Sequence, residues 1–361
     1  MTKKRTAVIA GSVAAGAVVA GAVSRTVIHR RREHHLEDVL WDVPPDDLGP
    51  VTSFDGTELS VRAAGPIDAP TVLFVHGFSL DMTTWHEQWL DLSVDLRCVL
   101  MDQRGHGRSA KAAHGDLSLR AMGRDVAAVL EATSGGRPSV LVGHSMGAMS
   151  ILAAAEQRPE LFGSSVAGVV LIGAASSDLL RGAMGTITDL VRPRLGSFGA
   201  AAHRVDRLRR AVLASPADLR GAVARLTQFG PDAPQHVVDH IVHLAERASS
   251  DVWTDGLAEL MEMDMRHAVP RLRVPAVVVV GEHDRVTPPA AAIELAGALP
   301  EARLVVIEGA GHMPMLERPL ELNREIRGFA RSLLLPEPVH RPARRKPPAR
   351  GKAGKRGEAA P

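Results

Sequence analysis

The chain has 361 residues, of which 45% are hydrophobic and 23% are charged, and its mean hydropathy is +0.01. These values are typical of a globular protein with one large domain or two small ones, and they exclude a collagen-like or wholly disordered chain. The one cysteine, Cys98, excludes an intrachain disulfide framework and any zinc or iron–sulfur site built from several cysteines.

The net charge of +2 is unevenly distributed along the chain. Residues 1–32 contain seven basic residues and no acidic one, and residues 336–361 contain eight basic and two acidic residues. Residues 33–335 therefore hold 28 basic against 39 acidic residues, a net charge of −11. Because the basic excess lies at the two ends, the charge gives no reason to expect a nucleic-acid partner for the central part.

Residues 6–24 form an uncharged segment, rich in Ala, Val and Gly, between two clusters of basic residues. As a helix rising about 1.5 Å per residue it would extend over about 28 Å, close to the hydrocarbon thickness of a bilayer. We interpret residues 1–32 first as a single-pass membrane anchor with basic flanks. The alternatives are a signal peptide cleaved near residues 20–22, which implies secretion, and a flexible Ala/Gly-rich arm. The similar charge on both sides leaves the orientation in the membrane open.

Two further segments lack apolar periodicity. Residues 33–49 are polar, end in Pro44-Pro45-Asp46-Asp47 and are predicted to be a linker. Residues 336–361 mix Pro, Arg, Lys, Gly and Ala, which predicts a disordered basic tail that either binds anionic lipid head groups or is simply solvated.

Residues 50–335 are predicted to form one α/β domain. A hairpin signal comes first, with short strands at 51–54 and 59–62 joined through Asp55-Gly56. Helical stretches then alternate with continuous apolar runs, which are typical of strands buried on both faces of a parallel sheet. The runs cover residues 72–75, 97–101, 140–142, 169–172, 277–280 and 304–307. This alternation predicts a doubly wound, mostly parallel sheet of eight strands.

One long interval interrupts the alternation. Residues 176–270 contain no strand-like run, only segments with helical periodicity at 205–214, 216–229, 235–248 and 252–263. We predict an inserted helical cap over this interval.

The strongest chemical signal is Gly143-His144-Ser145-Met146-Gly147, which directly follows a predicted strand and directly precedes a predicted helix. This is the context of a nucleophile elbow, in which the flanking glycines allow a sharp turn that exposes the serine hydroxyl above the sheet. Ser145 is therefore the predicted nucleophile.

A serine nucleophile needs a base, and the base needs a carboxylate that orients it. Asp284 and His312 follow the last two predicted strands, so the chain order is Ser, Asp, His. We predict that His312 is the base and Asp284 the acid. Glu282 and Asp178 are the alternative acids, and Asp178 follows the sixth predicted strand.

The reaction also needs donors for the oxyanion of the tetrahedral intermediate. The backbone N–H groups of Met146 and Phe78 are predicted to supply them, because one follows the nucleophile and the other lies in the loop after the third strand. The neighbouring residues predicted to contact substrate are His76, Gly77, His144 and Met313.

One segment of the predicted cap carries a second group of residues that could form a functional site, here for a metal ion. His236, His240 and His243 share one face of a predicted helix, with Asp239 adjacent. Two histidines four residues apart can bind zinc, but the segment lacks the glutamate of the H-E-x-x-H motif. Pocket lining and a solvated helix face are the other interpretations, and we predict no metal.

Together these segments resemble the α/β-hydrolase superfamily over about residues 50–335. The motifs that carry the resemblance are His76-Gly77-Phe78, Asp102 to Ser109, Gly143 to Gly147, Gly281 to Asp284 with Pro288, and Gly311-His312. In such families the Asp102 segment is mainly a structural loop beside the site. Epoxide hydrolases and haloalkane dehalogenases use an aspartate nucleophile, and epoxide hydrolases also need cap tyrosines, whereas this chain has Ser145 and no tyrosine.

The resemblance implies a serine hydrolase without a cofactor that cleaves carboxylic esters, like the carboxylesterases and lipases. The predicted substrate is a small ester or lipid with an apolar acyl group. A carbon–carbon bond hydrolase or a cofactor-free perhydrolase would use the same triad. A catalytically silent, membrane-tethered binding protein is the alternative of a different class.

Overall fold

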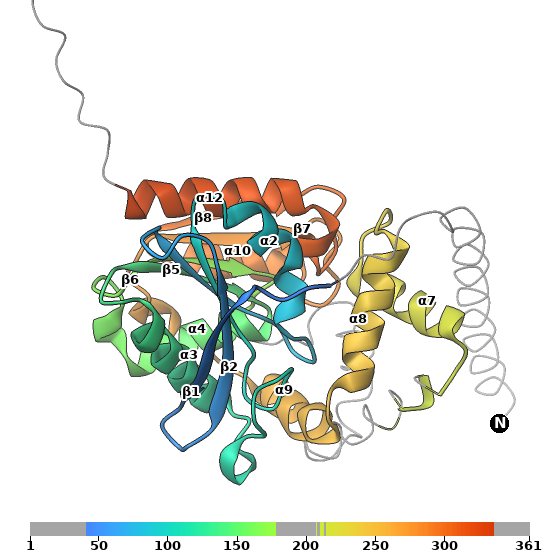
Figure 1. Cartoon of the computed structure of the whole chain (residues 1–361). Coiled ribbons are helices and arrows are strands. Elements are labelled where there is room, and N and C mark those ends of the chain that lie inside the picture. The colour runs from blue at the N-terminus through green and yellow to red at the C-terminus, as the bar shows by residue number, and fades with distance from the viewer. Residues whose placement is uncertain (1–40, 178–206, 208–209, 213, 336–361) are drawn as a thin grey trace, which may run out of the picture.

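The computed structural model describes residues 41–177, 207, 210–212 and 214–335 (Figure 1). Within these ranges, no helix is both long enough and apolar enough to cross a membrane. The predicted anchor at residues 6–24 and the predicted basic tail lie outside the described residues, so both stay predictions.

An eight-stranded sheet forms the centre of the molecule, as the alternating pattern predicts. The spatial order is β1-β2-β4-β3-β5-β6-β7-β8, and all pairs are parallel except β1–β2 and β2–β4. The strands are β1 (Asp46–Thr52), β2 (Glu58–Ala64), β3 (Thr71–Val75), β4 (Arg97–Met101), β5 (Ser139–His144), β6 (Val166–Ile172), β7 (Ala276–Gly281) and β8 (Ala302–Ile307). The predicted fold class is therefore confirmed, except for the N-terminal hydrophobic helix, which is not described.

The first two strands form the hairpin that Asp55-Gly56 predicts. Thr52 pairs with Glu58, and the Ser53 amide donates to the Thr57 carbonyl at 2.8 Å. Gly56 has a φ of +89°, a conformation that favours glycine.

Apolar side chains cover both faces of the sheet, because successive residues of a strand point to opposite sides. Leu73 and Val75 belong to the core on one face, and Val72 and Phe74 to the core on the other. The first core is completed by α3 (Leu119–Thr133), α4 (Met146–Gln157) and α10 (Pro289–Ala298), and the second by α2 (His86–Leu92) and α12 (Pro319–Leu334). Because side chains of the core cover both faces, we expect the functional loops at the ends of the strands.

The described residues of the segment between β6 and β7 form helices joined by loops, with one isolated β-bridge between Ser177 and Asp264. Its elements are α7 (Ala217–Gln228), α8 (Gln235–Arg247), the π-helix η6 (Val252–Gly256) and α9 (Leu257–Glu262). In Figure 1, α7 and α8 lie to one side of the sheet. The predicted helices at 216–229 and 235–248 are thus present as α7 and α8, whereas half of the residues 205–214 lie outside the described part of the chain.

Short helical turns complete the described structure: η1 (Met82–Trp85), η2 (Ala113–Gly115), η3 (Pro159–Leu161), η7 (Val269–Arg271) and α11 (Pro314–Glu317).

The segment before β1 is in close contact with the domain. The Trp41 ring stacks on the His240 ring of α8, with centroids 4.0 Å apart, and meets the His86 ring of α2 edge-on at 5.6 Å. The carbonyl of Asp42 accepts the indole N–H of Trp89 at 3.2 Å. Trp41 and Asp42, within the predicted linker, therefore join the cap to α2. The strand β1 begins at Asp46, also inside that predicted linker.

Candidate active site

Ser145 occupies the sharp turn between β5 and α4. Its φ of +50° lies in the left-handed region, which is strained for a residue with a side chain. The glycines on either side make this turn possible. A Cβ atom at Gly143 would lie 2.6 Å from the Ala148 nitrogen, and one at Gly147 would lie 2.2 Å from the Val75 carbonyl oxygen. The predicted nucleophile elbow is thus present in its expected geometry, with Ser145 9% exposed.

His312 and Asp284 form a buried hydrogen-bonded pair, as the sequence predicts. The Nδ1 atom of His312 lies 2.8 Å from Oδ2 of Asp284. The other carboxylate oxygen, Oδ1, accepts the backbone N–H groups of Val286 and Thr287, each at 2.8 Å. The hydroxyl of Thr287 donates to Oδ2 at 2.8 Å. The carboxylate is therefore fixed on three sides, and Nε2 is the ring nitrogen of His312 left for a substrate-side proton.

The surroundings of Asp284 favour its charged form. Burial alone raises the pKa of this carboxyl group. The charge and hydrogen bond of His312, together with the hydrogen bonds from Thr287, outweigh burial and hold the pKa below its ordinary value. A carboxylate that stays ionised can stabilise an imidazolium beside it.

Gly173 provides room for this pair, a role that the sequence pattern did not reveal. It follows β6 with a φ of +54°, and a Cβ atom there would lie 3.1 Å from Nδ1 and Cε1 of His312. Ile172, the residue before Gly173, accepts the Ser145 amide through its carbonyl at 2.8 Å. The serine turn and the His–Asp pair therefore meet at the end of β6.

The two alternative acids have different outcomes. Glu282 is half-exposed and accepts the Gly309 amide at 3.0 Å, so its carboxylate supports the loop before His312. Asp178 lies outside the described residues.

The two predicted oxyanion donors are the amides of Phe78 and Met146. Met146 is the first residue of α4, and Phe78 follows the end of β3. Within the described part of the chain, neither amide is paired with an acceptor. Both amides are thus available to a ligand oxygen.

The four residues predicted to contact substrate, His76, Gly77, His144 and Met313, are buried. His76 places Nδ1 2.8 Å from the Gly77 carbonyl and accepts the Gln103 amide through Nε2 at 3.0 Å. Met313 belongs to the core that contains α12. These contacts are internal, and substrate binding by these residues stays a prediction.

His144 lies next to His312, with ring centroids 4.7 Å apart. Its Nε2 atom is 2.9 Å from the His312 carbonyl oxygen, and because a carbonyl only accepts, this nitrogen carries the proton. A Cβ atom at Gly77 would lie 2.7 Å from Nδ1 of His144, so only glycine fits there. Burial, and next the charge of His312, lower the pKa of His144 to about 3. His144 is therefore neutral and supports His312.

An aromatic wall lies beside the predicted oxyanion loop. The rings of Phe78 and Trp253 meet edge-on with centroids 5.0 Å apart, and a Cβ atom at Gly256 would lie 3.4 Å from the Phe78 ring. Trp253 comes from η6 in the cap, and no motif in the sequence marked it. The cap thus contributes an apolar side chain next to Phe78.

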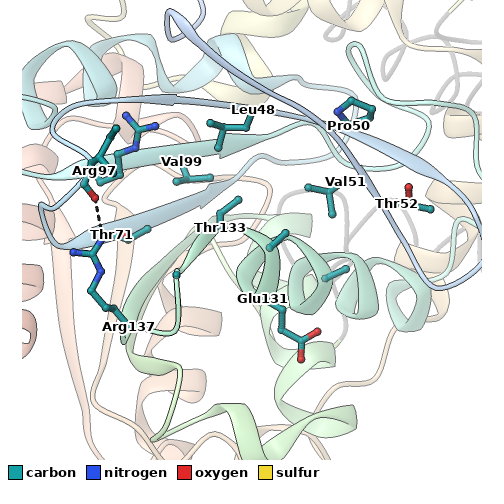
Figure 2. Close-up of a pocket in the computed structure, with 14 residues that line it drawn as sticks. Leu48, Pro50, Val51, Thr52, Thr71, Arg97, Val99, Glu131, Thr133 and Arg137 are labelled. Carbon is teal, nitrogen blue, oxygen red and sulfur yellow. Dashed lines mark hydrogen bonds between the residues drawn. The ribbon is translucent and has the colours of Figure 1, made fainter.

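A pocket of about 890 Å³ lies at the other end of the strands, and Figure 2 shows residues that line it. It is lined by Thr71 and Arg97, the first residues of β3 and β4, and by Val51 of β1. Ser145 and His312 instead lie at the carboxyl ends of strands, where open α/β sheets place their active sites. This cavity is therefore separate from the candidate active site.

The cap histidines form no metal site in the described part of the chain, where no group of three or more potential ligands is arranged around a common point. His240 is buried beneath Trp41, and its Nε2 atom lies 3.0 Å from the Thr83 hydroxyl. Burial, and next the charges of His243 and His86, lower the pKa of His240 to about 3. His240 thus joins the cap to the segments before β1 and α2.

We expect this histidine to make stability depend on pH. An unfolded histidine takes up a proton near pH 6.5, whereas folded His240 resists it down to about pH 3. The contribution of neutral His240 to the free energy of unfolding is therefore complete above about pH 6.5. It is lost as the pH falls from about 6.5 toward about 3. Urea unfolding of wild type and His240→Gln at pH 7.5 and 5.0 measures this effect. The variant should lose less stability than wild type between the two pH values, and equal losses would contradict the assignment.

The geometry defines the class of protein. An open parallel sheet that carries Ser, Asp and His after its strands, in this chain order, is the arrangement of an α/β-hydrolase enzyme. The family model described as "alpha/beta hydrolase fold" matches residues 70–319, so the chain belongs to this family.

The chain is also similar to curated proteins and to solved structures. The chain is 29% identical over 293 residues to a non-heme chloroperoxidase of Streptomyces lividans, covering 79% of this chain and 100% of the relative. It is 27% identical over 297 residues to a bifunctional esterase/perhydrolase of Acinetobacter calcoaceticus, with 79% and 100% coverage. The fold is similar to that of a thermophilic esterase from Thermogutta terrifontis, with a TM-score of 0.64, 23% identity, and 80% and 99% coverage.

Proposed function

We propose that this enzyme hydrolyses carboxylic esters of apolar acyl groups through an acyl-enzyme formed on Ser145. The observation that carries the proposal is the 2.8 Å contact between His312 and Asp284. It is supported by the strained turn of Ser145, whose amide donates to Ile172 at the end of β6, one residue before the Gly173 that adjoins the His312 ring. The esterase named among the relatives adds support.

In the first half of the reaction, the Ser145 oxygen attacks the ester carbonyl carbon while Nε2 of His312 takes the hydroxyl proton. The carbonyl oxygen becomes an oxyanion that accepts hydrogen bonds from the Phe78 and Met146 amides. His312 then gives its proton to the leaving alcohol, and the carbon–oxygen bond to that alcohol breaks. Asp284 stabilises the imidazolium between the two proton transfers.

In the second half, water attacks the acyl-enzyme and His312 takes the proton of that water. The tetrahedral intermediate collapses, the bond to Ser145 breaks, and the serine recovers its proton from His312. The products are a carboxylic acid and an alcohol.

The preference for apolar acyl groups rests on Phe78 and Trp253, which form a ring pair beside the oxyanion loop. Apolar contact contributes about 0.8 kcal/mol for each buried methylene group, so a longer acyl chain gains affinity until the pocket is filled.

A panel of p-nitrophenyl esters from acetate to palmitate tests this proposal. We expect kcat/KM to rise by about threefold to fourfold per methylene, up to an optimum length and then to fall. A Trp253→Ala variant should flatten the rise, whereas Trp89→Ala, a tryptophan on α2, should keep it. Absence of turnover on every ester would contradict the proposed function, and a flat profile would contradict the apolar preference.

A perhydrolase is a second candidate, because one relative is named as a bifunctional esterase/perhydrolase. In that reaction hydrogen peroxide replaces water as the attacker of the acyl-enzyme, and a peracid forms. Assaying peracid from the same esters with added peroxide separates the two outcomes of one intermediate.

We also propose that residues 6–24 anchor the enzyme to a membrane, an idea supported by the sequence of that segment alone. Fractionation of the full chain against a chain without residues 1–32 tests it. Equal amounts of both proteins in the membrane fraction would contradict an anchor.

A further inference from the structure

One buried carboxylate lies behind the catalytic histidine and takes no part in the proposed reaction. Glu317 is the last residue of α11 and is 5% exposed. Its Oε1 atom accepts the Gly311 amide at 2.8 Å and the Met313 amide at 3.3 Å. These are the residues immediately before and after His312.

The second oxygen of Glu317 reaches the cap. Its Oε2 atom accepts the amide of Gly230 at 2.7 Å. Gly230 lies two residues beyond the end of α7, and the last residue of α7, Gln228, accepts the His312 amide through its carbonyl at 2.7 Å. The loop that carries His312 is therefore bonded to the cap at two points.

Close packing leaves this arrangement little freedom. A Cβ atom at Gly311 would lie 2.6 Å from the Gln228 carbonyl oxygen and 2.6 Å from the Gly230 nitrogen. The His312 carbonyl accepts Nε2–H of His144 at 2.9 Å, so the remaining backbone polar group of His312 is also paired. A shift of the cap would thus displace the loop that holds the imidazole.

From these contacts we infer that Glu317 is a positioning residue for His312 and that it ties the cap to the catalytic loop. The inference rests on the proposed function, because it assigns His312 the role of base. Three N–H donors converge on this side chain, and a carboxylate, which only accepts, suits all three. A reacting geometry displaced by about 1 Å can cost about 100-fold in rate, so this support is expected to affect catalysis.

Glu317→Gln is the sharpest test because it preserves shape. The amide has one accepting end: if the oxygen faces Gly311 and Met313, its NH₂ group opposes the Gly230 amide, and the reverse orientation opposes two amides. We expect kcat on a p-nitrophenyl ester to fall about 10-fold per titrated active site, with KM within about threefold. Inactivation by a fluorophosphonate should slow by the same factor, since both reactions need His312 to take the proton of Ser145.

Asn323→Ala is the matched control. Asn323 is buried on α12 and donates to the Glu87 carbonyl of α2 at 3.1 Å, so its loss should lower Tm. We expect its kcat to stay within about twofold of wild type below the unfolding transition.

The outcomes separate the two ideas. If Glu317→Gln has a lower Tm but reacts at the wild-type rate per active site, Glu317 is only structural and the inference is wrong. If the Gln variant does not fold, Glu317→Asp replaces it, since the charge is kept and the reach is shorter; a wild-type rate in that variant would also overturn the inference. If wild type itself neither turns over esters nor reacts with the fluorophosphonate, the proposed function fails first and the inference falls with it.

Discussion

Replacing Ser145 by alanine should lower ester turnover by about 10⁴-fold to 10⁶-fold, because no other group described at the site can form the acyl-enzyme. The substitution removes the attacking oxygen while the Phe78 and Met146 amides remain. Binding of substrate should therefore change far less than kcat. Steady-state kinetics on a p-nitrophenyl ester, with product hydrolysis in buffer subtracted, measures the effect.

Ser150→Ala provides the control for this substitution. Ser150 is buried on the same helix, α4, and its hydroxyl oxygen lies 2.9 Å from two acceptors, the Met146 carbonyl oxygen and Oε1 of Gln103. We expect its kcat to stay within about threefold of wild type, since it loses only internal hydrogen bonds. Residual turnover above 1% of wild type in a pure Ser145→Ala protein would contradict the assignment of the nucleophile.

Asp284→Asn should lower kcat by about 10⁴-fold at neutral pH. The reason lies in the contacts of the carboxylate. Two backbone amides, from Val286 and Thr287, donate to Oδ1, so the oxygen of an asparagine is held on that side. Its NH₂ group then faces Nδ1 of His312, which must accept. The proton of the imidazole moves to Nε2, and the ring cannot take the proton of Ser145.

Glu282→Gln is the matched control for the acid, because Glu282 lies in the same loop and is the alternative carboxylate. It accepts the Gly309 amide and lies half-exposed, so we expect a kcat within about threefold of wild type. Nuclear magnetic resonance of the Nδ1 proton of His312 should show the changed tautomer in Asp284→Asn. An Asp284→Asn protein that keeps more than a tenth of the wild-type kcat would contradict the role of Asp284.

The sequence was sufficient for the fold class, for the sharp turn at Ser145 and for the contact between Asp284 and His312. Apolar runs predicted the parallel strands, and the Asp55-Gly56 turn predicted the hairpin, because both signals depend on neighbouring residues. Ser145 and the Asp284–His312 pair were found for the same reason, since each is marked by a local motif after a strand.

The supporting residues could not be found in this way. Gly173 is one of 33 glycines in the chain. It matters because a Cβ atom at this position would lie 3.1 Å from the ring of His312, a residue that is distant in the sequence. Glu317 and Trp253 act through contacts between the cap and the core. The contact of Trp41 with His240 likewise joins distant segments, and a polar, proline-containing sequence gave no sign of it. Such roles are set by tertiary structure, so no spacing rule reveals them.

In the proposed reaction, Ser145 is a nucleophile activated by His312. Mass spectrometry of the protein after reaction with a fluorophosphonate can identify the reacting residue. We predict one adduct per chain, located by peptide mapping on Ser145, at least a 100-fold slower reaction in His312→Ala, and no adduct in Ser145→Ala. An adduct on another residue, or the same rate without His312, would contradict the claim.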